Sequence, residues 1–461
     1  MIDICVQVKE VVQICLLDPL GNGNRHFRHL HYLRDWSGAF IPGYFPFPPL
    51  DLLYAATYLK KYGYGVKIIE ASIKHLSHKK VVEILNKDIP NFVVIPSAYF
   101  STEDDKYLSR LIRKSIPSTK IIFCGPLATY NPALFLSDGS ADFIALGELE
   151  SSLLSIVKGD YSDNVAYYDQ GKISIGRRKL LDLSQLPIPD RSLINVSAYK
   201  YAIVNRRNPV TTMTMSRGCP HGKCKFCSAW LYTMGELRYR DINSVCAEID
   251  EIVYKYNIGE IFFRDQAFTA NRDYIVKVCE HMISHGLDIS WRATTRVDLV
   301  DRELLALMKK AGCYQISFGF ESSSQESLDI NNKGISVAQS RQAAKWAKDA
   351  GLEVVGMFMF GMLGDTEDSL KEQLKFVLEL DLDYVQFNES YLLPGTPVYD
   401  EFIQDKDLFL SRRLVKKHVI ASYLRFYLRP SYIRKQLKKI RSFDDVKFLI
   451  KAGVDELLFH L

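Results

Sequence analysis

The sequence predicts an α/β protein in which a doubly wound parallel sheet is followed by a partial barrel of six strand–helix units and a helical C-terminal region. Three observations support this fold class. Short runs rich in Val, Ile and Phe alternate with amphipathic helical stretches along most of the 461 residues. Three closely spaced cysteines occupy the loop after the first strand of the second half. Glycines and polar residues follow many of the predicted strands.

The composition fits a chain with several domains and large cores. Hydrophobic residues make up 47% of the chain, and the net charge is +5 at pH 7. This mild basicity is too weak to indicate a nucleic-acid partner. The 9 cysteines, an odd number spread through predicted strands and helices, favour a reducing compartment over a disulfide framework. We find no signal peptide and no apolar run that could span a membrane, and we therefore expect a cytoplasmic protein.

Residues 1–158 predict the doubly wound sheet. The expected strands are residues 11–17, 66–70, 92–95, 120–124 and 143–146. Helices are expected at residues 50–62 and from Ser101, where Asp104 would complete a capping box. Ligands of such sheets bind outside the carboxyl ends of the strands. Those ends carry Asp18, Pro19, Ser97, Ala98, Tyr99, Gly125, Pro126, Gly147 and Glu148.

The strand pattern alone does not identify the ligand of this first domain. Residues 21–23 contain two glycines but lack the third glycine and the context of a dinucleotide-binding loop. A domain that only packs against the rest of the chain stays an alternative. Residues 20–47 form a long loop with His26, His29 and His31. Without acidic partners, these histidines indicate a solvated or lid surface more than a metal site.

Residues 159–209 predict a linker, because turn residues dominate and no long periodicity is present. Residues 210–395 predict the partial barrel. Its expected strands are residues 210–216, 260–264, 289–294, 314–320, 354–360 and 384–388, with helices such as residues 243–256 between them. Six units would leave the barrel open on one side, and active sites of such barrels lie at the carboxyl ends of the strands.

Cys219, Cys224 and Cys227 follow the first barrel strand within one short loop. Three thiolates on one loop can hold three irons of a [4Fe–4S] cluster and leave the fourth iron open to a substrate or cofactor. Two alternatives stay open, namely a structural zinc site that adds His221, and three unrelated buried thiols. The spacing disfavours zinc, because Cys219 and His221 form a tight bite and no second ligand pair follows.

This loop, with the aromatic Phe226 before its last cysteine, resembles the cysteine loop of the radical S-adenosylmethionine (radical SAM) superfamily. The resemblance implies a [4Fe–4S] cluster on Cys219, Cys224 and Cys227, and bound S-adenosylmethionine. The superfamily usually has three residues and then two between its cysteines, whereas this chain has four and then two. We expect Gly222 to absorb the extra residue as a turn.

The resemblance also assigns contacts to S-adenosylmethionine at successive strand ends. The expected residues are Phe226, Asp265, Arg296, Glu321, Ser322 and Gly361. Phe226 would lie against the adenine, and Arg296 would clamp the carboxylate. Glu321 and Ser322 would hold the ribose hydroxyls. Leu363 stands where the subfamily commonly has proline.

Three segments of the first domain, starting at Pro48, Cys124 and Ala145, resemble the cobalamin-binding domain that precedes many radical SAM domains. The residues that this resemblance places against cobalamin are Ser97, Tyr99, Gly125, Pro126, Gly147 and Glu148. Cys124 stands where the subfamily usually has a further glycine. The Asp-x-His-x-x-Gly pattern is absent, so we expect no histidine ligand to cobalt, as is usual in this subfamily.

Residues 396–461 predict a basic helical region. An apolar stripe that includes Val415, Val419 and Tyr423 lies opposite Arg412 and Lys416. One interpretation is a helix that makes peripheral contact with an anionic membrane. The other is a helix packed on the barrel with a solvated basic face, which is the commoner use of such a stripe.

Together the resemblances imply an enzyme that cleaves S-adenosylmethionine to a 5′-deoxyadenosyl radical and, with cobalamin, methylates an unactivated carbon. The expected partners are a small-molecule or lipid substrate, placed near Asn388, Glu389 and Tyr391, and an external electron donor of the flavodoxin or ferredoxin type. The alternatives are a radical cyclase or rearrangement enzyme of the same subfamily, and a cobalamin-binding sensor with a degenerate barrel. We also expect the barrel without residues 1–158 to keep slow cleavage of S-adenosylmethionine.

Overall fold

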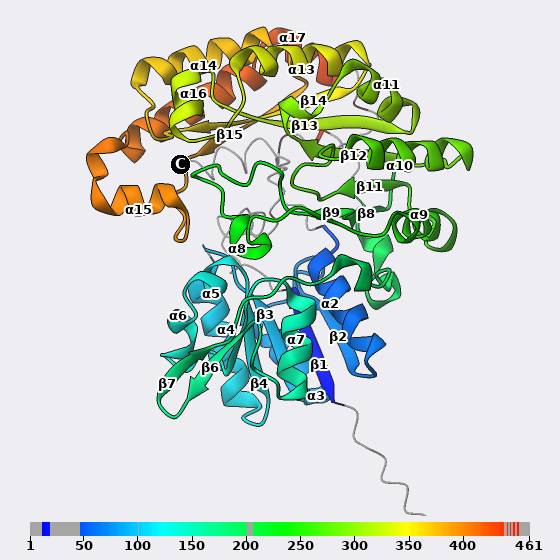
Figure 1. Cartoon of the computed structure of the whole chain (residues 1–461), viewed down its shortest axis with the longest axis vertical. Coiled ribbons are helices and arrows are strands. Elements are labelled where there is room, and N and C mark those ends of the chain that lie inside the picture. The colour runs from blue at the N-terminus through cyan, green and yellow to red at the C-terminus, as the bar shows by residue number, and fades with distance from the viewer. Residues whose placement is uncertain are drawn as a thin grey trace, which may run out of the picture.

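The computed structural model describes residues 12–18, 47–99, 101–200 and 206–437, together with residues 440, 443, 446, 447 and 450. Figure 1 shows two stacked α/β units, the first domain coloured blue to cyan and the barrel green to orange, with the short helix α8 (Trp230–Thr233) between them. The predicted loop over residues 20–47, including its three histidines, lies outside the described residues except for Phe47.

The first sheet has the strand order β2-β1-β3-β4-β5-β6-β7, and its first five strands are parallel. These strands are β1 (Gln13–Asp18), β2 (Gly65–Glu70), β3 (Phe92–Pro96), β4 (Lys120–Cys124) and β5 (Phe143–Ala145). The helices α2 (Leu50–Lys61) and α7 (Leu149–Lys158) cover one face, and α3 (His78–Asp88), α4 (Thr102–Ser115), α5 (Pro126–Tyr130) and α6 (Ala133–Leu136) cover the other. The doubly wound prediction is therefore confirmed, with all five strands in place.

A hairpin that the sequence analysis did not predict extends this sheet. Strands β6 (Val165–Asp169) and β7 (Lys172–Ile175) are antiparallel and lie within the predicted linker. Their two-residue turn places Gln170 at φ 47° and Gly171 at φ 81°. In sequences, such a turn is usually marked by Asn or Asp before the glycine. Here Gln170 occupies that position, and the two short strands alone do not predict a hairpin.

The predicted capping box of α4 is wrong, although Ser101 does occupy the N-cap position. The Ser101 hydroxyl donates to the Asp105 carboxylate at 2.6 Å and accepts from the Ala98 amide at 3.2 Å. Asp104 instead lies 3.1 Å from the ring of His78 on α3. The Asp104 carboxylate, which the capping box would use, therefore interacts with a side chain of another helix.

The second sheet contains six parallel strands in simple sequential order, β8-β11-β12-β13-β14-β15. They are β8 (Val210–Met213), β11 (Glu260–Phe263), β12 (Ser290–Thr295), β13 (Cys313–Glu321), β14 (Glu353–Phe360) and β15 (Tyr384–Glu389). The helices between them are α9 (Ile242–Asp250), α10 (Arg272–Ser284), α11 (Arg302–Lys310), α12 (Gln325–Ile330), α13 (Val337–Asp349) and α14 (Glu367–Glu379). Strand β8 ends at Met213, before the predicted end at residue 216. Residues 216–217 instead form β9 (Ser216–Arg217), which pairs with β10 (Arg238–Tyr239) in a separate two-stranded ribbon.

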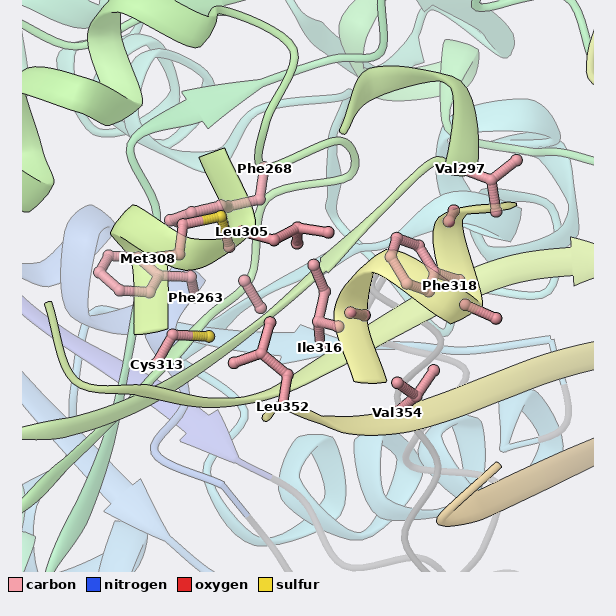
Figure 2. Packing of buried hydrophobic residues seen from close by; sticks show 14 of the residues in the cluster. Phe263, Phe268, Val297, Leu305, Met308, Cys313, Ile316, Phe318, Leu352 and Val354 are labelled. Carbon is pink, nitrogen blue, oxygen red and sulfur yellow. The ribbon is translucent and has the colours of Figure 1, made fainter. Parts of the chain in front are cut away.

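The main barrel core lies between the sheet and its helices. Ile316, Phe318 and Phe320 alternate along β13 and are completely buried in this core, as the two-residue period of a strand requires. The Phe263 and Trp291 rings meet edge to face, with centroids 5.4 Å apart. Figure 2 shows Phe263, Phe268, Leu305 and Met308 gathered at one side of Ile316. The residues between these core positions therefore face the opposite, concave side of the sheet.

One apolar cluster runs from the first domain into the barrel. It contains Leu16 and Leu53 of the first domain together with Val210 and Phe262 of the barrel. The Phe47 and Phe262 rings meet edge to face at 5.4 Å between centroids. Shared burial of this kind is typical of a fixed interface rather than of two domains on a loose tether.

The C-terminal helices are α15 (Pro397–Gln404), α16 (Arg412–Tyr427) and α17 (Pro430–Leu437). Val415, Val419, Tyr423 and Phe426 of α16 are buried in the barrel core. The packed interpretation is therefore confirmed, and the stripe considered for a membrane surface is occupied by the barrel. In the described part of the chain, no helix has the length and hydropathy to cross a membrane.

Helix α16 also covers the exposed edge of β15. The Tyr423 hydroxyl accepts from the Phe387 amide at 3.0 Å and donates to the Phe387 carbonyl at 3.2 Å. The Tyr427 hydroxyl does the same at Val385, at 3.0 and 2.6 Å. Since an open barrel leaves an edge strand that could pair with another chain, these two hydroxyls block that edge.

Replacing both Tyr423 and Tyr427 with Phe should open the edge of β15. A buried backbone group that loses its partner costs about 1–3 kcal/mol. We expect amide hydrogen exchange at Val385 and Phe387 to accelerate by roughly 10-fold or more. The matched control is Tyr254→Phe, since the Tyr254 side chain is exposed. Unchanged exchange at both amides would contradict the assigned role of the hydroxyls.

Candidate active site at the cysteine loop

The three cysteines lie in the loop between β9 and α8, and all three are partly buried. Gly218 opens this loop at φ 109°, where an added Cβ would lie 1.9 Å from the Glu236 carbonyl oxygen, so only glycine fits. Gly222 has φ 58°, a left-handed conformation that fits the expected role of this glycine at the extra residue. Two glycines therefore bend the backbone on either side of Cys219.

His221 bears on the choice between a cluster and a single zinc ion. Within the described ranges, no three His, Cys, Asp or Glu side chains converge on one ion position. His221, the fourth ligand of the zinc alternative, has its Nε2 2.6 Å from the Asn332 carbonyl oxygen. In a [4Fe–4S] cluster each of the three thiolates would bind a different iron, and His221 would not be required as a ligand.

Burial controls the charge of the thiols. It raises the pKa of Cys227 to about 12, with a further contribution from neighbouring Cys224. Burial also raises the pKa of Cys224, although the cations of Lys333 and Arg296 act in the opposite direction. The Cys224 and Cys227 thiols of the metal-free chain are therefore protonated near neutral pH, and iron binding must release their protons.

The cysteine loop is hydrogen-bonded to the segment that follows α12, residues 331–334. The Lys225 amide donates to the Asn331 carbonyl at 3.0 Å, and the Asn332 side-chain amide donates to the Lys223 carbonyl at 3.2 Å. Gly334 has φ 67°, and an added Cβ there would lie 2.6 Å from the His221 ring. The extra residue of the loop is thus accommodated by contacts that this segment provides.

The structure connects Arg296 and Glu321 through Lys333. Arg296 donates to both Asp298 oxygens at 2.9 and 3.0 Å, and to the Lys333 carbonyl at 3.1 Å. Burial lowers the pKa of Arg296, but Asp298 more than offsets this effect and the pKa lies above its usual value. The Lys333 ammonium donates to Glu321 at 2.7 Å. Sequence reasoning missed Lys333, because no local motif marks a lysine that becomes buried only in the folded barrel.

Glu321 stands at the carboxyl end of β13 in a strained conformation. Its φ of 63° lies in the left-handed region, and the strand pairing is irregular just before it. A non-glycine residue in this region costs about 1–3 kcal/mol and is typical of functional sites. The strain turns the carboxylate back over Gly319 and onto Lys333, where an added Cβ on Gly319 would lie 2.5 Å from a Glu321 oxygen.

Asp265 is buried and stabilises the backbone that leads into the cysteine loop. Its carboxylate accepts from the Met215 amide at 3.1 Å, and from the Ser216 amide and hydroxyl, both at 2.6 Å. Burial raises its pKa to about 6, although these hydrogen bonds act in the opposite direction. Asp265 thus shapes the loop, and the expected direct contact with S-adenosylmethionine stays a prediction.

Ser322 and Gly361 also form local contacts within the protein. The Ser322 hydroxyl accepts from the Ser324 amide at 3.1 Å, next to the start of α12. Gly361 has φ 77°, and an added Cβ would lie 2.6 Å from Val415 on α16. The space beside Gly361 is therefore occupied by a helix of the same chain, and the expected contact of Gly361 with S-adenosylmethionine stays a prediction. Phe226 lies between Cys224 and Cys227 and is partly buried.

The carboxyl edge of the first sheet is built from close backbone contacts. Gly125 has φ 114°, and an added Cβ there would lie 2.1 Å from the Ser97 carbonyl oxygen. Gly147 has φ 70° and leaves room for Arg178, whose guanidinium would lie 2.4 Å from an added Cβ. Pro126 begins α5 at this edge. The Ser97 hydroxyl is buried and has no hydrogen-bond partner in the part of the chain that the structure describes, which fits a polar ligand at this edge.

Tyr99 and Glu148 point across to the barrel. The Tyr99 hydroxyl donates to the Pro394 carbonyl at 2.9 Å. Glu148 accepts from Arg217 at 3.1 Å and from Arg238 at 2.7 Å. Burial opposes its ionisation, but the two arginines hold the pKa of Glu148 below its usual value. These polar atoms already have protein partners, so their contact with cobalamin stays a prediction.

Two family models match the chain. That of the radical SAM superfamily covers residues 213–377, and that of the B12 binding domain covers residues 40–157. With the barrel and its cysteine loop, these matches define the protein as a radical SAM protein. It belongs to the group of this superfamily that carries a cobalamin-binding domain ahead of the barrel.

Two relatives are similar over most of their length. An uncharacterized methyltransferase of Pyrococcus horikoshii is 28% identical over 439 residues, which are 89% of this chain and 93% of the relative. The anaerobic magnesium-protoporphyrin IX monomethyl ester cyclase of Cereibacter sphaeroides is 28% identical over 468 residues, covering 92% of this chain and 75% of the relative. The names of these relatives therefore include both a methyltransferase and a cyclase.

Two solved structures share the fold. TsrM from Kitasatospora setae, a radical S-adenosylmethionine methyltransferase with cobalamin and a [4Fe–4S] cluster, has a TM-score of 0.67 at 14% identity, covering 86% of this chain and 75% of its own. OxsB, a cobalamin-dependent S-adenosylmethionine radical enzyme, has a TM-score of 0.66 at 19% identity, covering 87% of this chain. The present chain spans only 56% of OxsB.

The two domains imply three cofactors. The radical SAM domain uses a [4Fe–4S] cluster and S-adenosylmethionine, and the B12 binding domain uses cobalamin. The residues at both sites fit these groups, since the cysteine loop offers three free thiols and the first sheet offers a glycine-built edge with the Ser97 hydroxyl, which has no hydrogen-bond partner among the described residues.

Alanine at Cys219, Cys224 or Cys227 should remove the cluster. Protein reconstituted without oxygen should carry about four irons and four sulfides per chain, and each variant should carry almost none. Iron and sulfide analysis with absorption spectra measures this directly. The Cys279→Ala variant is the control, because Cys279 is buried in the barrel core away from the loop. Stoichiometric zinc without sulfide would exclude the cluster.

Asp265→Asn should change how stability depends on pH. The carboxylate has a pKa of about 6 in the fold, against an ordinary 3.8, so its protonated form stabilises the folded chain. That stability is present below about pH 4 and is lost as pH rises through 6. Since Asn cannot ionise, the free energy of unfolding of wild type minus variant should fall by about 2 kcal/mol between pH 4 and pH 7. Urea unfolding of the metal-free proteins measures this, and a difference independent of pH would contradict it.

Proposed function

We propose that this chain is a cobalamin-dependent radical SAM enzyme that methylates an unactivated carbon. When bound, the cluster and S-adenosylmethionine supply the 5′-deoxyadenosyl radical, and cobalamin supplies the methyl group. The observation that carries the proposal is the meeting of both strand-end edges at the cysteine loop. Tyr99, just after β3, reaches Pro394 beyond β15, and α8 packs on α5 of the first domain.

Lys333, Arg296 and Glu321 support the assignment of a site for S-adenosylmethionine. The two cations lie close enough to Cys224 to lower its pKa, so they can also hold a carboxylate beside the cluster. Glu321 is poised at the same place as an acceptor for hydroxyl groups. In the ligand-free chain these residues bind one another, which keeps the buried charges paired until the cofactor replaces those contacts.

Polar side chains on the concave face of the barrel favour a substrate that has hydrogen-bonding groups. Ser317 alternates with core residues of β13, and Asn388 accepts from Gln386 at 2.8 Å on β15. The Thr294 hydroxyl on β12 is buried and makes no hydrogen bond to the described residues. Glu389 is buried and accepts from Arg412 at 3.1 Å, which brings α16 to the expected substrate end of β15.

The same residues also suit a second candidate function. The similarity to anaerobic magnesium-protoporphyrin IX monomethyl ester cyclases supports radical ring formation without methyl transfer. Both reactions need an external one-electron donor, and both need a reducing compartment that keeps the loop cysteines reduced. We propose the cytoplasm as that compartment. The outcome for the methyl group separates the two functions.

Trideuteromethyl S-adenosylmethionine provides the test. The anaerobic enzyme, loaded with its cluster and cobalamin and supplied with a reductant, is incubated with a metabolite extract, and mass spectrometry follows the label. The product should gain the whole labelled methyl group, with S-adenosylhomocysteine and 5′-deoxyadenosine formed in equal amounts. Substrate consumption with 5′-deoxyadenosine but no labelled methyl would favour the cyclase. The Cys227→Ala variant, which lacks the cluster, is the control.

A further inference from the structure

The cysteine loop is held at its start by the first domain. Arg217, two residues before Cys219, makes a bidentate ion pair with Glu150, at 2.6 and 3.1 Å, and contacts Glu148 at 3.1 Å. Both glutamates begin α7 of the first domain, and both are buried. Because a buried charge without its partner is strongly destabilising, Arg217 has one favourable position. That position fixes where the backbone enters the loop.

The first domain also holds the end of the loop. Ser228, directly after Cys227, lies close enough to the Tyr99 hydroxyl to act against the burial that raises the pKa of Tyr99. Arg178 donates to the carbonyl of Leu231 in α8 at 2.7 Å. Arg178 packs in turn against Gly147, at the carboxyl edge of the first sheet. The residues after the last cysteine are therefore fixed by the same edge at which the first domain would bind its ligand.

The turn at Pro394 and Gly395, beyond β15, also contacts both the first domain and α8. Gly395 has φ 89°, and an added Cβ would lie 2.7 Å from the Tyr130 ring and 3.3 Å from Leu231. The neighbouring Pro394 accepts the hydrogen bond from Tyr99. Further along, the Val398 amide donates to the carbonyl of Lys225, between two of the cysteines. The loop is thus enclosed by the first domain and by the end of the barrel.

We propose that the first domain is a clamp for the cysteine loop, and that Arg217 and Tyr99 are positioning residues for the cluster-binding thiols. Neither side chain needs to touch iron. Each one fixes the backbone on one side of the three cysteines, so that the thiols are held ready for the cluster. The contacts argue against the expectation that the barrel acts alone, since removal of residues 1–158 would free both ends of the loop.

This inference rests on the cluster of the proposed enzyme but not on methyl transfer. A failure of the labelling experiment leaves the clamp intact, and a failure of the clamp leaves the chemistry intact. The readout is the rate at which the reconstituted, oxygen-free full-length protein loses iron to a chelator. The electron paramagnetic resonance spectrum of the reduced cluster provides a second readout, which a change in overall stability would not alter.

The test compares graded variants. Glu148→Gln with Glu150→Gln should speed iron loss by about 10-fold or more, because Arg217 loses both buried carboxylates. Tyr99→Phe removes one hydroxyl and should speed iron loss by about 5-fold. Arg217→Met should resemble the double variant, and Arg217→Lys should restore part of the retention because it keeps the charge. Each faster variant should also show an altered resonance spectrum.

The matched control is Lys60→Met, which breaks an ion pair between the first domain and Asp190 of the linker at 2.5 Å, away from the cysteine loop. It should lose iron at the wild-type rate. The clamp is overturned if the folded Tyr99→Phe and Arg217→Met proteins retain iron and give spectra like wild type. If the double glutamine variant does not fold, Tyr99→Phe still decides the matter, because it deletes a single oxygen atom.

Discussion

Buried charge at the junction of the two domains is the constraint on which the rest of this structure depends. Glu248 is completely buried between Arg191 and Arg240, at 2.6 and 2.5 Å, and Arg240 also donates to the Tyr54 hydroxyl of the first domain at 2.7 Å. A buried ion pair that loses one partner costs about 3–5 kcal/mol. The two ion pairs therefore hold Arg191 of the linker on the barrel, and the hydrogen bond from Arg240 to Tyr54 joins this buried cluster to the first domain.

The position of the cysteine loop follows from this constraint. The arginines of the β9–β10 ribbon, which flanks the loop, are neutralised by carboxylates of the first domain. The apolar cluster that includes Leu53 and Phe262 stabilises the same domain orientation, but hydrophobic burial is non-directional and does not specify it. Ion pairs thus specify the geometry, and apolar burial supplies much of the stability. The two strand-end edges that bear the cofactor residues are consequently held facing the same loop.

Local signals were enough to predict most of the fold. Strand positions follow from short apolar runs, and all eleven predicted strands are found within a few residues of their expected places. The hairpin β6–β7 was missed because Gln170 occupies the position at which Asn or Asp would mark the turn. The cysteine loop could be predicted because its ligands are adjacent in sequence, and the turn at Gly222 could be predicted for the same reason.

Partners that are distant in sequence could not be predicted. Lys333 becomes a site residue only because the chain after α12 returns beneath the cysteine loop. Glu148 was expected at a ligand, but it pairs with Arg217 and Arg238, 69 and 90 residues further along. Asp265 has backbone partners that only the folded β8–β9 segment supplies. A strand-end position shows that a residue is near a site, whereas the identity of its partner depends on tertiary structure.

Electron spin measurements can show whether the two cofactors share one site. Because the edges of both sheets meet at the cysteine loop, a reduced cluster and a cob(II)alamin held by the same chain should lie close enough for their electron spins to interact. Electron paramagnetic resonance of the doubly loaded protein should then show broadened or split signals that are absent from the singly loaded forms. A spectrum equal to the sum of the two singly loaded spectra would contradict a shared site.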